Sequence, residues 1–365
     1  MAWEATSAAG RTAAALNRGG PKIEGPLKGY HHETYVISLD ATVGVPGACG
    51  EAVRWKCREP REGLFWFDRR CFASEEVVVE ALNGRVARIP ELIETGGVRL
   101  QRFIEGTTLG SRYGAGSAVP ERLVRQVLEV VGELARIRPA TVTVKCVCAP
   151  EDRVPDGDSA GFLTRLVHFT ETQVYRARQD EYGALFAALG VHEVAFKYLR
   201  ERAADLRERP FTLLHADLHR ENLILDRSGE LWVIDWELAM FGDPLYDLAT
   251  HLHLMDYPRS QRRRVVELWR GTLGRTGARG LDEDLPVLLG YKRAQSVFTD
   301  VIRSALTLAD GAGARAGAAR LPEVARKLHG VLVRGAGPLG IHSVPSARAV
   351  GTALRTWLSR RTPPR

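Results

Sequence analysis

The chain has 365 residues, of which 45% are hydrophobic and 26% are charged, and its net charge at pH 7 is +7. No apolar run approaches the eighteen residues of a membrane span, and Glu4 with no apolar block after it argues against a signal peptide. Five scattered cysteines favour reduced thiols, and Cys146-Val147-Cys148 has the wrong spacing for a zinc knuckle. We therefore expect a cytoplasmic protein with a core large enough for two lobes.

The first third of the chain predicts short strands and one helix. Residues 29–37 read as strand, turn and strand, and residues 52–56 read as a strand that ends in a lysine. Residues 74–82 predict a helix, because Ser74 can cap it and the early acids suit the helix dipole. Asn83-Gly84 then ends the helix.

The middle of the chain turns from strand to helix. Residues 98–109 are predicted as a strand followed by a linker, and residues 120–137 carry apolar side chains at helical spacing. Residues 139–159 form a loop rich in Pro, Asp and Gly. Helices are expected at residues 162–182 and 195–207, and the second of these is basic and amphipathic.

The candidate catalytic and metal-binding side chains lie in two short segments. These are residues 215–222, His-Ala-Asp-Leu-His-Arg-Glu-Asn, and residues 233–237, Val-Ile-Asp-Trp-Glu. Asn222 follows Asp217 by five residues, and Asp235 follows it by eighteen. Phosphoryl transfer needs a carboxylate to orient and deprotonate the attacking hydroxyl, and an amide and a carboxylate to hold magnesium on the phosphates. Short β-prone runs flank the motif, so we expect the three polar groups at strand ends around one small space.

Together with Gly-Asp-Pro-Leu-Tyr-Asp-Leu-Ala at residues 242–249, this pattern resembles the aminoglycoside phosphotransferase and choline kinase family. That family is the small-molecule branch of the protein-kinase-like fold, and the resemblance covers residues 211–253. The chain departs from the family pattern at Ala216, where Gly is usual, and at Arg220, where Pro is usual.

The resemblance implies an α+β fold with two lobes. A small antiparallel-sheet lobe in residues 1–103 is expected to bind the nucleotide, and a larger, mainly helical lobe in residues 104–365 is expected to carry catalysis and acceptor binding. By the same resemblance Asp217 is the catalytic base, and Asn222 and Asp235 hold Mg²⁺.

The resemblance also assigns the binding site for the phosphate donor, ATP or GTP. Thr34 is the candidate hydroxyl of a phosphate-covering loop, whose backbone N–H groups would cradle the phosphates. Adenine is expected to bond to backbone groups near Gln101 to Phe103, in the hinge between the lobes.

Lys56 resembles the strand lysine that pairs with the α- and β-phosphates of the nucleotide. Its expected carboxylate partner is Glu75 on the following helix. Kinase helices place apolar residues three, four and seven positions after that glutamate, and only Glu75 is followed in this way by Val78, Val79 and Leu82.

Other interpretations of the motif are weaker. A zinc hydrolase would need further ligands, and His251 and His253 fall in a predicted helix where positions i and i+2 do not share a face. An inactive kinase fold used as a binding module is disfavoured because the expected nucleotide, base and metal residues are all present. We interpret His215 as structural, and the resemblance implies that Asp247 braces the loop from behind.

The acceptor side carries an unusual charge. From residue 251 onward the chain is mainly helical and holds 20 basic and 8 acidic side chains, a net charge of about +12. Kinases for polycationic aminoglycosides are expected to line this site with carboxylates, and residues 282–284 are the one acidic cluster here. We therefore predict a neutral or nucleoside-like antibiotic or related natural product as acceptor, with a choline, sugar or amino-alcohol kinase as the alternative. Residues 262–264 lack the aromatic interleaving of a nucleic-acid site, so neither nucleic acid nor membrane is an expected partner.

Overall fold

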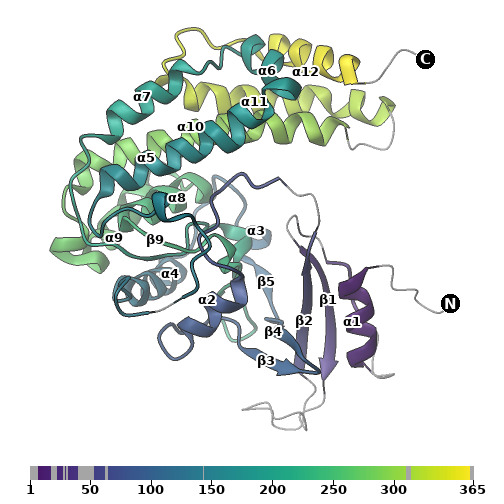
Figure 1. Cartoon of the computed structure of the whole chain (residues 1–365), viewed down its shortest axis with the longest axis vertical. Helices are drawn as coiled ribbons and strands as arrows, with labels where there is room; N and C mark the ends of the chain where they lie inside the picture. The colour runs from purple at the N-terminus through teal and green to yellow at the C-terminus, as the bar shows by residue number, and fades with distance from the viewer. Residues whose placement is uncertain are drawn as a thin grey trace.

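The computed structural model shows a small sheet lobe joined to a larger, mainly helical lobe, the predicted two-lobe α+β architecture (Figure 1). Tyr30 and His31 of the expected phosphate loop, and Ala52 of the expected strand, lie outside the described residues. The structure describes residues 7–17, 23–27, 29, 32–39, 53–61, 65–142, 144–309 and 314–361.

The sheet lobe is built on four antiparallel strands in the order β1-β2-β4-β3. These are β1 His32–Leu39, β2 Val53–Pro60, β3 Leu92–Thr95 and β4 Val98–Arg102. Helix α1, Ala8–Asn17, packs small alanines against aromatic and aliphatic side chains of β1, β2 and β4. This core fixes the register in which Lys56 of β2 lies opposite Val36 of β1, and so sets which β2 side chains share a face.

Helix α2, Glu75–Leu82, lies beside this sheet and begins where the sequence predicts. The Ser74 hydroxyl caps it by accepting a hydrogen bond from the N–H of Val77 at 3.4 Å. Glu75 is buried on the face that points into the molecule. The other buried residues of that face are Val78, Val79 and Leu82.

Beyond β4 the chain crosses to the helical lobe through Gly106, where a Cβ atom would lie 2.3 Å from the backbone oxygen of Leu225. Glycine therefore permits the close approach of this linker to the catalytic strands. Short strands then frame the catalytic loop in two small sheets, β5-β7-β8 and β6-β9. They are β5 Thr107–Thr108, β6 Thr212–Leu214, β7 Leu223–Leu225, β8 Leu231–Val233 and β9 Met240–Gly242.

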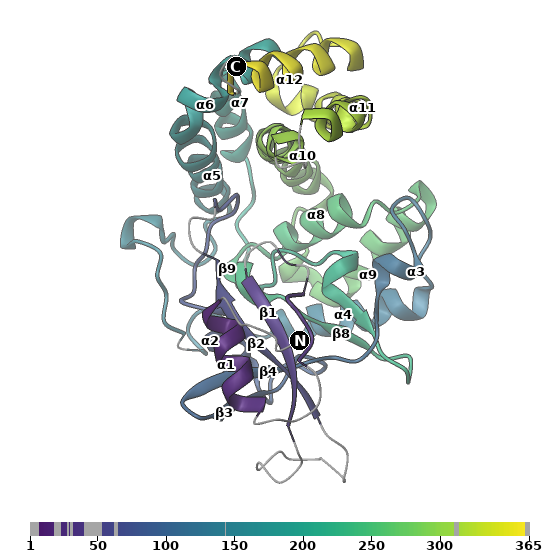
Figure 2. The ribbon, with the colours of Figure 1, turned by 90° about the vertical axis from the view of Figure 1, so that its right-hand side faces the viewer.

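The rest of the lobe is helical, and α10 to α12 lie at the end of the molecule farthest from strands β1 to β4 (Figure 2). In place of the helix expected at residues 162–182, the chain is helical from residue 159 to residue 188. This helical stretch contains a π turn and a 3-10 turn at residues 170–178. No helix in the described parts of the chain is long and apolar enough to cross a membrane. The helices are α3 Leu109–Arg112, α4 Glu121–Leu134, α5 Ser159–Phe169, α6 Gln179–Ala188, α7 Val194–Ala203, α8 Pro244–Met255, α9 Arg259–Gly277, α10 Leu281–Ala309, α11 Ala314–Leu339 and α12 Ala347–Arg361.

Candidate active site

A cleft of about 460 Å³ lies between the sheet lobe and the loops of the helical lobe. Of the predicted site residues, Gln101 and Asp217 lie outside its lining, although each bonds to a side chain that lines it. The cleft therefore brings together residues separated by about two hundred positions in the sequence. The predicted residues in its lining are Thr34, Lys56, Glu75, Phe103, Asn222 and Asp235.

The loop after β6 is held by buried polar contacts. The Asp247 carboxylate accepts the backbone N–H groups of His215 at 2.9 Å and Ala216 at 2.7 Å, which confirms the expected brace. His215 bonds through Nε2 to the carbonyl oxygen of Ile234 at 3.0 Å, and its Nδ1 accepts the Asp217 N–H at 3.3 Å. Burial lowers the pKa of His215 to about 4, so this structural histidine is neutral near pH 7.

The Asp217 carboxylate has two close side-chain partners. Asn222 donates from Nδ2 to Asp217 Oδ2 at 3.1 Å, and His219 Nε2 lies 3.3 Å from the same oxygen. The Nδ1 atom of His219 accepts the Glu221 N–H, so Nε2 carries the proton that faces Asp217. Burial favours the neutral acid, but His219 outweighs it and holds the pKa of Asp217 below its usual value. We had not predicted His219, although its place in the same loop was a signal.

The two departures from the family pattern have structural explanations. Ala216 adopts a left-handed conformation with φ of 64°, which an alanine adopts at a cost and a glycine adopts freely. Arg220 is buried and donates to the carbonyl oxygens of Met255, Tyr113 and Ser117. The guanidinium group therefore ties the loop to α8 and to the segment after α3.

Asp235 and Asn222 fit the donor set of a magnesium ion. Within the described residues the Asp235 carboxylate has no hydrogen-bond or ion-pair partner, and burial together with the Glu75 and Asp217 carboxylates raises its pKa. The Asn222 amide nitrogen is engaged with Asp217, which leaves its oxygen available. No group of three or more His, Cys, Asp or Glu side chains arranged for a metal occurs in the described chain. Mg²⁺ suits such a sparse set because it takes further oxygens from phosphates and water.

The partner of Glu75 differs from the expectation. Arg58 forms an ion pair with one carboxylate oxygen of Glu75, and Gln101 Nε2 donates to the other at 2.9 Å. Within the described residues, no carboxylate lies within 4.0 Å of Lys56 Nζ. Arg58 follows Lys56 by two residues on β2, so both side chains lie on the same face of the sheet. That spacing makes Arg58 a second candidate partner for Glu75, but the sequence alone does not choose between the two cations.

The hinge residues expected near the adenine are partly engaged by other groups of the protein. The Gln101 side chain is committed to Glu75, and the Phe103 N–H donates to the Arg54 carbonyl oxygen at 2.9 Å. Ile104 lines the cleft, and in the described part of the chain its backbone N–H and C=O have no hydrogen-bond partner. In the described part of the chain the free backbone groups of the hinge thus include those of Ile104, the residue after Phe103.

The phosphate end of the cleft carries two cations and one hydroxyl. Lys56 lies beside Arg58, and burial lowers the pKa of Lys56, although the Glu75 carboxylate opposes this shift. Thr34 on β1 lies opposite Arg58 in the sheet register and lines the same cleft. All three side chains therefore face the space in front of Asp235.

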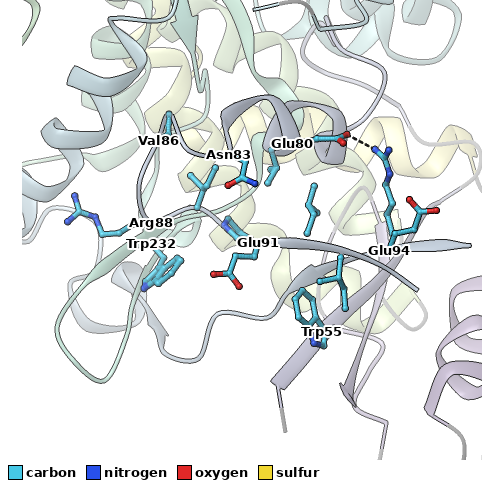
Figure 3. Close-up of a pocket in the computed structure, with 14 residues that line it drawn as sticks. Trp55, Glu80, Asn83, Val86, Arg88, Glu91, Glu94 and Trp232 are labelled. Carbon is cyan, nitrogen blue, oxygen red and sulfur yellow. Dashed lines mark hydrogen bonds and ion pairs between the residues drawn. The ribbon is translucent and has the colours of Figure 1, made fainter. Parts of the chain in front are cut away.

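A second cavity, of about 550 Å³, lies on the other side of α2 and contains none of the predicted site residues. Its lining includes Trp55, Trp232 and Glu80 of α2 (Figure 3), and Glu80 pairs with Arg99 of β4. Arg88 and Glu91 of its lining pair with residues outside the cavity, and its lining holds neither the lysine nor the amide and carboxylate that converge on the interlobe cleft. Volume alone therefore does not identify the site.

The acidic cluster at residues 282–284 is neutralised by arginines. Arg209 is fully buried, and it pairs with Asp243 of the Gly-Asp-Pro turn as well as with one member of the cluster. These carboxylates therefore hold α10 to neighbouring segments. The three pairs are Asp282–Arg270, Glu283–Arg207 and Asp284–Arg209.

A buried lysine that we had not predicted lies on the acceptor side of Asp217. Lys292 of α10 bonds to the Tyr246 hydroxyl at 3.3 Å and to Gln295 Oε1 at 2.7 Å. Gln295 in turn donates to Asp68 at 2.7 Å, and the positive charge of Lys292 contributes to lowering the pKa of Asp217. Helix α10 thereby reaches the segment that precedes α2.

The two histidines considered for zinc are engaged elsewhere. His251 is fully buried between the Leu218 carbonyl oxygen at 2.9 Å and the Tyr257 hydroxyl at 3.0 Å. His253 bonds to Ser296 at 2.7 Å. Each imidazole ring is therefore hydrogen-bonded to other groups of the helical lobe.

An antiparallel-sheet lobe joined by a hinge to a helical lobe, with Asp217, Asn222 and Asp235 at the cleft between them, is a protein-kinase-like architecture. The phosphotransferase enzyme family matches residues 72–283, which is more than half of the chain, and the chain belongs to this family.

The solved structures that the chain matches share little sequence with it. A choline/ethanolamine kinase family protein from Mesorhizobium loti is 16% identical, with 95% of this chain and 98% of that chain covered and a TM-score of 0.47. A choline kinase from Streptococcus pneumoniae is 16% identical, with 92% and 94% covered and a TM-score of 0.45. A macrolide 2'-phosphotransferase from Brachybacterium faecium is 16% identical, with 85% and 97% covered and a TM-score of 0.43.

Proposed function

We propose that the protein is a cytoplasmic phosphotransferase that moves the γ-phosphate of ATP or GTP to a hydroxyl group of a small molecule, with Mg²⁺ as cofactor. The observation that carries this proposal is the single cleft lined by Lys56, Asn222 and Asp235, with Asp217 bonded to Asn222 at its edge. The nucleotide lobe ends near residue 103, where the chain leaves β4 for the linker.

In this proposal the sheet lobe binds the donor. Lys56 and Arg58 place two positive charges against the phosphates, and Thr34 offers its hydroxyl. The free backbone groups of Ile104 are suited to the edge of a purine base. Bound Mg²⁺, held by Asn222 and Asp235, supplies neutralisation of charge on the phosphates.

Asp217 orients the acceptor hydroxyl and accepts its proton in the proposed reaction. Its side chain is 26% exposed, so a hydroxyl group can reach it. Asn222 and His219 hold its carboxylate from the sides, and Asp247 holds the loop backbone from behind. Catalysis then depends on positioning, which these four residues provide.

We propose an antibiotic or related natural product as acceptor, of the kind modified by resistance enzymes, and neutral or nucleoside-like rather than polycationic. In support, the one acidic cluster of the acceptor-side segment is already paired with arginines. A buried lysine, Lys292, lies near Asp217. A polycation would therefore meet few unpaired carboxylates there.

The test is release of nucleoside diphosphate, from ATP and from GTP, in the presence of a panel of acceptors at physiological salt. The panel spans polycationic aminoglycosides, neutral macrolides, nucleoside antibiotics, choline, sugars and amino alcohols. Acceptor-dependent turnover that Asp217→Asn abolishes supports the phosphotransferase. Efficient turnover of the polycationic members alone, with kcat/KM above about 10⁴ M⁻¹s⁻¹, would contradict the proposed acceptor class. Best turnover of choline, sugars or amino alcohols would favour the metabolite kinase.

A further inference from the structure

Glu237 joins the two lobes beside the proposed metal-binding position. It lies in the 3-10 turn that follows Asp235, and it is buried although it lines the interlobe cleft. Its Oε1 atom lies 3.3 Å from the guanidinium group of Arg70, in the segment that leads into α2. Its Oε2 atom lies 3.6 Å from Nδ1 of His32, the first residue of β1. One carboxylate of the helical lobe therefore contacts two separate segments of the sheet lobe.

The segment around Arg70 is docked on the helical lobe on both sides of that ion pair. Asp68 accepts a hydrogen bond from Gln295 of α10 at 2.7 Å. The ring of Phe72 meets the ring of Phe241 of β9 edge to face, with 6.0 Å between the ring centroids. The chain therefore enters α2 from the surface of the helical lobe, and Glu237 adds an ion pair to this docking.

The contact at His32 reaches the phosphate-facing side of β1. His32 and Thr34 are two residues apart on the strand, so their side chains share the face that lines the cleft. Arg58 lies opposite Thr34 in the sheet register and donates to His32 Nδ1 at 3.0 Å. Arg58 also pairs with Glu75 of α2. Glu237 therefore faces the end of a polar chain that contains one of the cations proposed to meet the phosphates.

The two arginines near Glu237 favour its ionised form. Burial raises the pKa of Glu237 to about 7, and the charges of Arg70 and Arg58 oppose this shift. Removing the Arg70 charge leaves either a buried carboxylate with less compensation or a neutral acid without an ion pair across the lobe boundary. Either outcome weakens the contact between the lobes.

We propose that Glu237 is a positioning residue for phosphoryl transfer, which holds β1 and the entry to α2 against the helical lobe so that the phosphate-binding side chains of the sheet lobe face Asp235. The inference rests on the proposed nucleotide site. Glu237 acts through Arg70 and His32, whereas Asn222 and Asp235 remain the proposed metal ligands. Because the contact sets the position of the phosphate-binding groups, its loss should weaken nucleotide binding by the folded protein.

Nucleotide affinity tests this role. Binding of ATP to the full-length protein is measured by calorimetry at about pH 8, above the pKa of Glu237, once with magnesium and once with excess EDTA. Glu237→Gln and Arg70→Met should each weaken binding by about 3- to 30-fold in both conditions, and the double variant should weaken it no further. Glu80→Gln is the matched control, because Glu80 pairs with Arg99 inside the sheet lobe, and this variant should bind ATP as the wild-type protein does.

Hydrogen exchange tests the contact without any ligand. In Glu237→Gln and Arg70→Met the backbone amides of α2 should exchange faster than in the wild-type protein, because the chain that leads into this helix loses its ion pair to the helical lobe. The amides of α12, which lies at the far end of the helical lobe, should exchange at the wild-type rate (Figure 2). Glu80→Gln should leave both helices unchanged.

The outcomes separate positioning from other roles. Wild-type affinity in both single variants, even with a lower urea midpoint, would assign Glu237 to stability alone and overturn the positioning role. A loss seen only with magnesium would make Glu237 a metal ligand, and additive losses in the double variant would show that Glu237 and Arg70 act separately; each result would overturn the inference, as would unchanged exchange of α2. Absence of ATP binding by the wild-type protein would instead overturn the proposed function, and the exchange of α2 would still decide whether Glu237 holds the lobes together.

Discussion

The Arg58–Glu75 ion pair gives a direct comparison of two cations on one strand. Arg58→Met leaves the buried Glu75 carboxylate with only its Gln101 hydrogen bond, whereas Lys56→Met removes a cation that has no carboxylate within 4.0 Å in the described chain. Breaking a buried pair by removing one partner costs about 3–5 kcal/mol of unfolding free energy. We expect that loss for Arg58→Met and about 1 kcal/mol or less for Lys56→Met.

The Arg58–Glu75 pair should also affect how the free energy of unfolding changes at acidic pH. Burial alone would raise the pKa of Glu75, but Arg58 and Gln101 outweigh it and lower the pKa below the unfolded value of 4.5. The stability contributed by Glu75 is therefore present above about pH 4.5 and is lost as the pH falls through the lower folded-state pKa. Arg58→Met should lose less stability over this acidic range than the wild-type protein does.

The assays are urea unfolding at pH 7 and along an acid series, together with turnover under varied nucleotide concentration. Lys56→Met should keep its stability and lose about 10- to 150-fold in kcat/KM for the nucleotide, the value of a charge-assisted bond of about 1.5–3 kcal/mol. Equal destabilisation by Lys56→Met and Arg58→Met would refute the assignment of Glu75 to Arg58. Double mutants with Glu75→Gln measure the coupling of each cation to that carboxylate.

Three further predictions concern the proposed base, the metal and buried histidines. Asp217→Asn should keep fold and nucleotide binding but lower kcat by roughly 10²- to 10⁴-fold, and near-wild-type turnover would remove Asp217 from its role. Asp235→Ala should lose the magnesium-dependent part of thermal stabilisation by nucleotide, with Asn222→Ala less affected; an unchanged melting shift would contradict the metal assignment. Burial lowers the pKa of His215 and His251 to about 4, so stability present above pH 6.5 should fall as pH drops toward 4, and urea unfolding of His251→Gln should show a shallower fall.

Local sequence determined the parts of the structure that we predicted correctly. The start of α2 follows from the Ser74 cap and the acids behind it, and both lie within one helical turn. The loop brace by Asp247 is what the family resemblance implies, and the two backbone N–H groups that its carboxylate accepts confirm it. The assignments of Asp217 and Asp235 to chemistry stay predictions.

The errors came from contacts between distant segments. Lys56 and Arg58 share a strand face, so the sequence alone does not determine which of them reaches Glu75. The bonds of Arg220 depend on carbonyl groups more than thirty residues away in either direction. The π-helical interruption near Tyr175 has no periodicity signal, because the apolar positions continue through it. Tertiary packing decides each of these features.

The charge of the acceptor-side segment shows why a net count is an incomplete guide. Two of its arginines pair with acids from other parts of the chain, Arg264 with Glu121 and Arg361 with Glu181, and Arg270 pairs with acids of the segment itself, so these three contribute little to the local field.

Three other arginines of the described segment are not neutralised by a nearby carboxylate. Within the described residues Arg262, Arg293 and Arg334 have no carboxylate within 4.0 Å, and His253 lies among them and Lys292. Burial first and then these four cations lower the pKa of His253 to about 3. Lys292 connects this group to Asp217, since its charge acts on both. Of these cations Lys292 bears on the proposed base, so Lys292→Met should relax the exclusion of polycationic acceptors, whereas removal of a paired arginine such as Arg264 should not, although a net count treats the two changes alike.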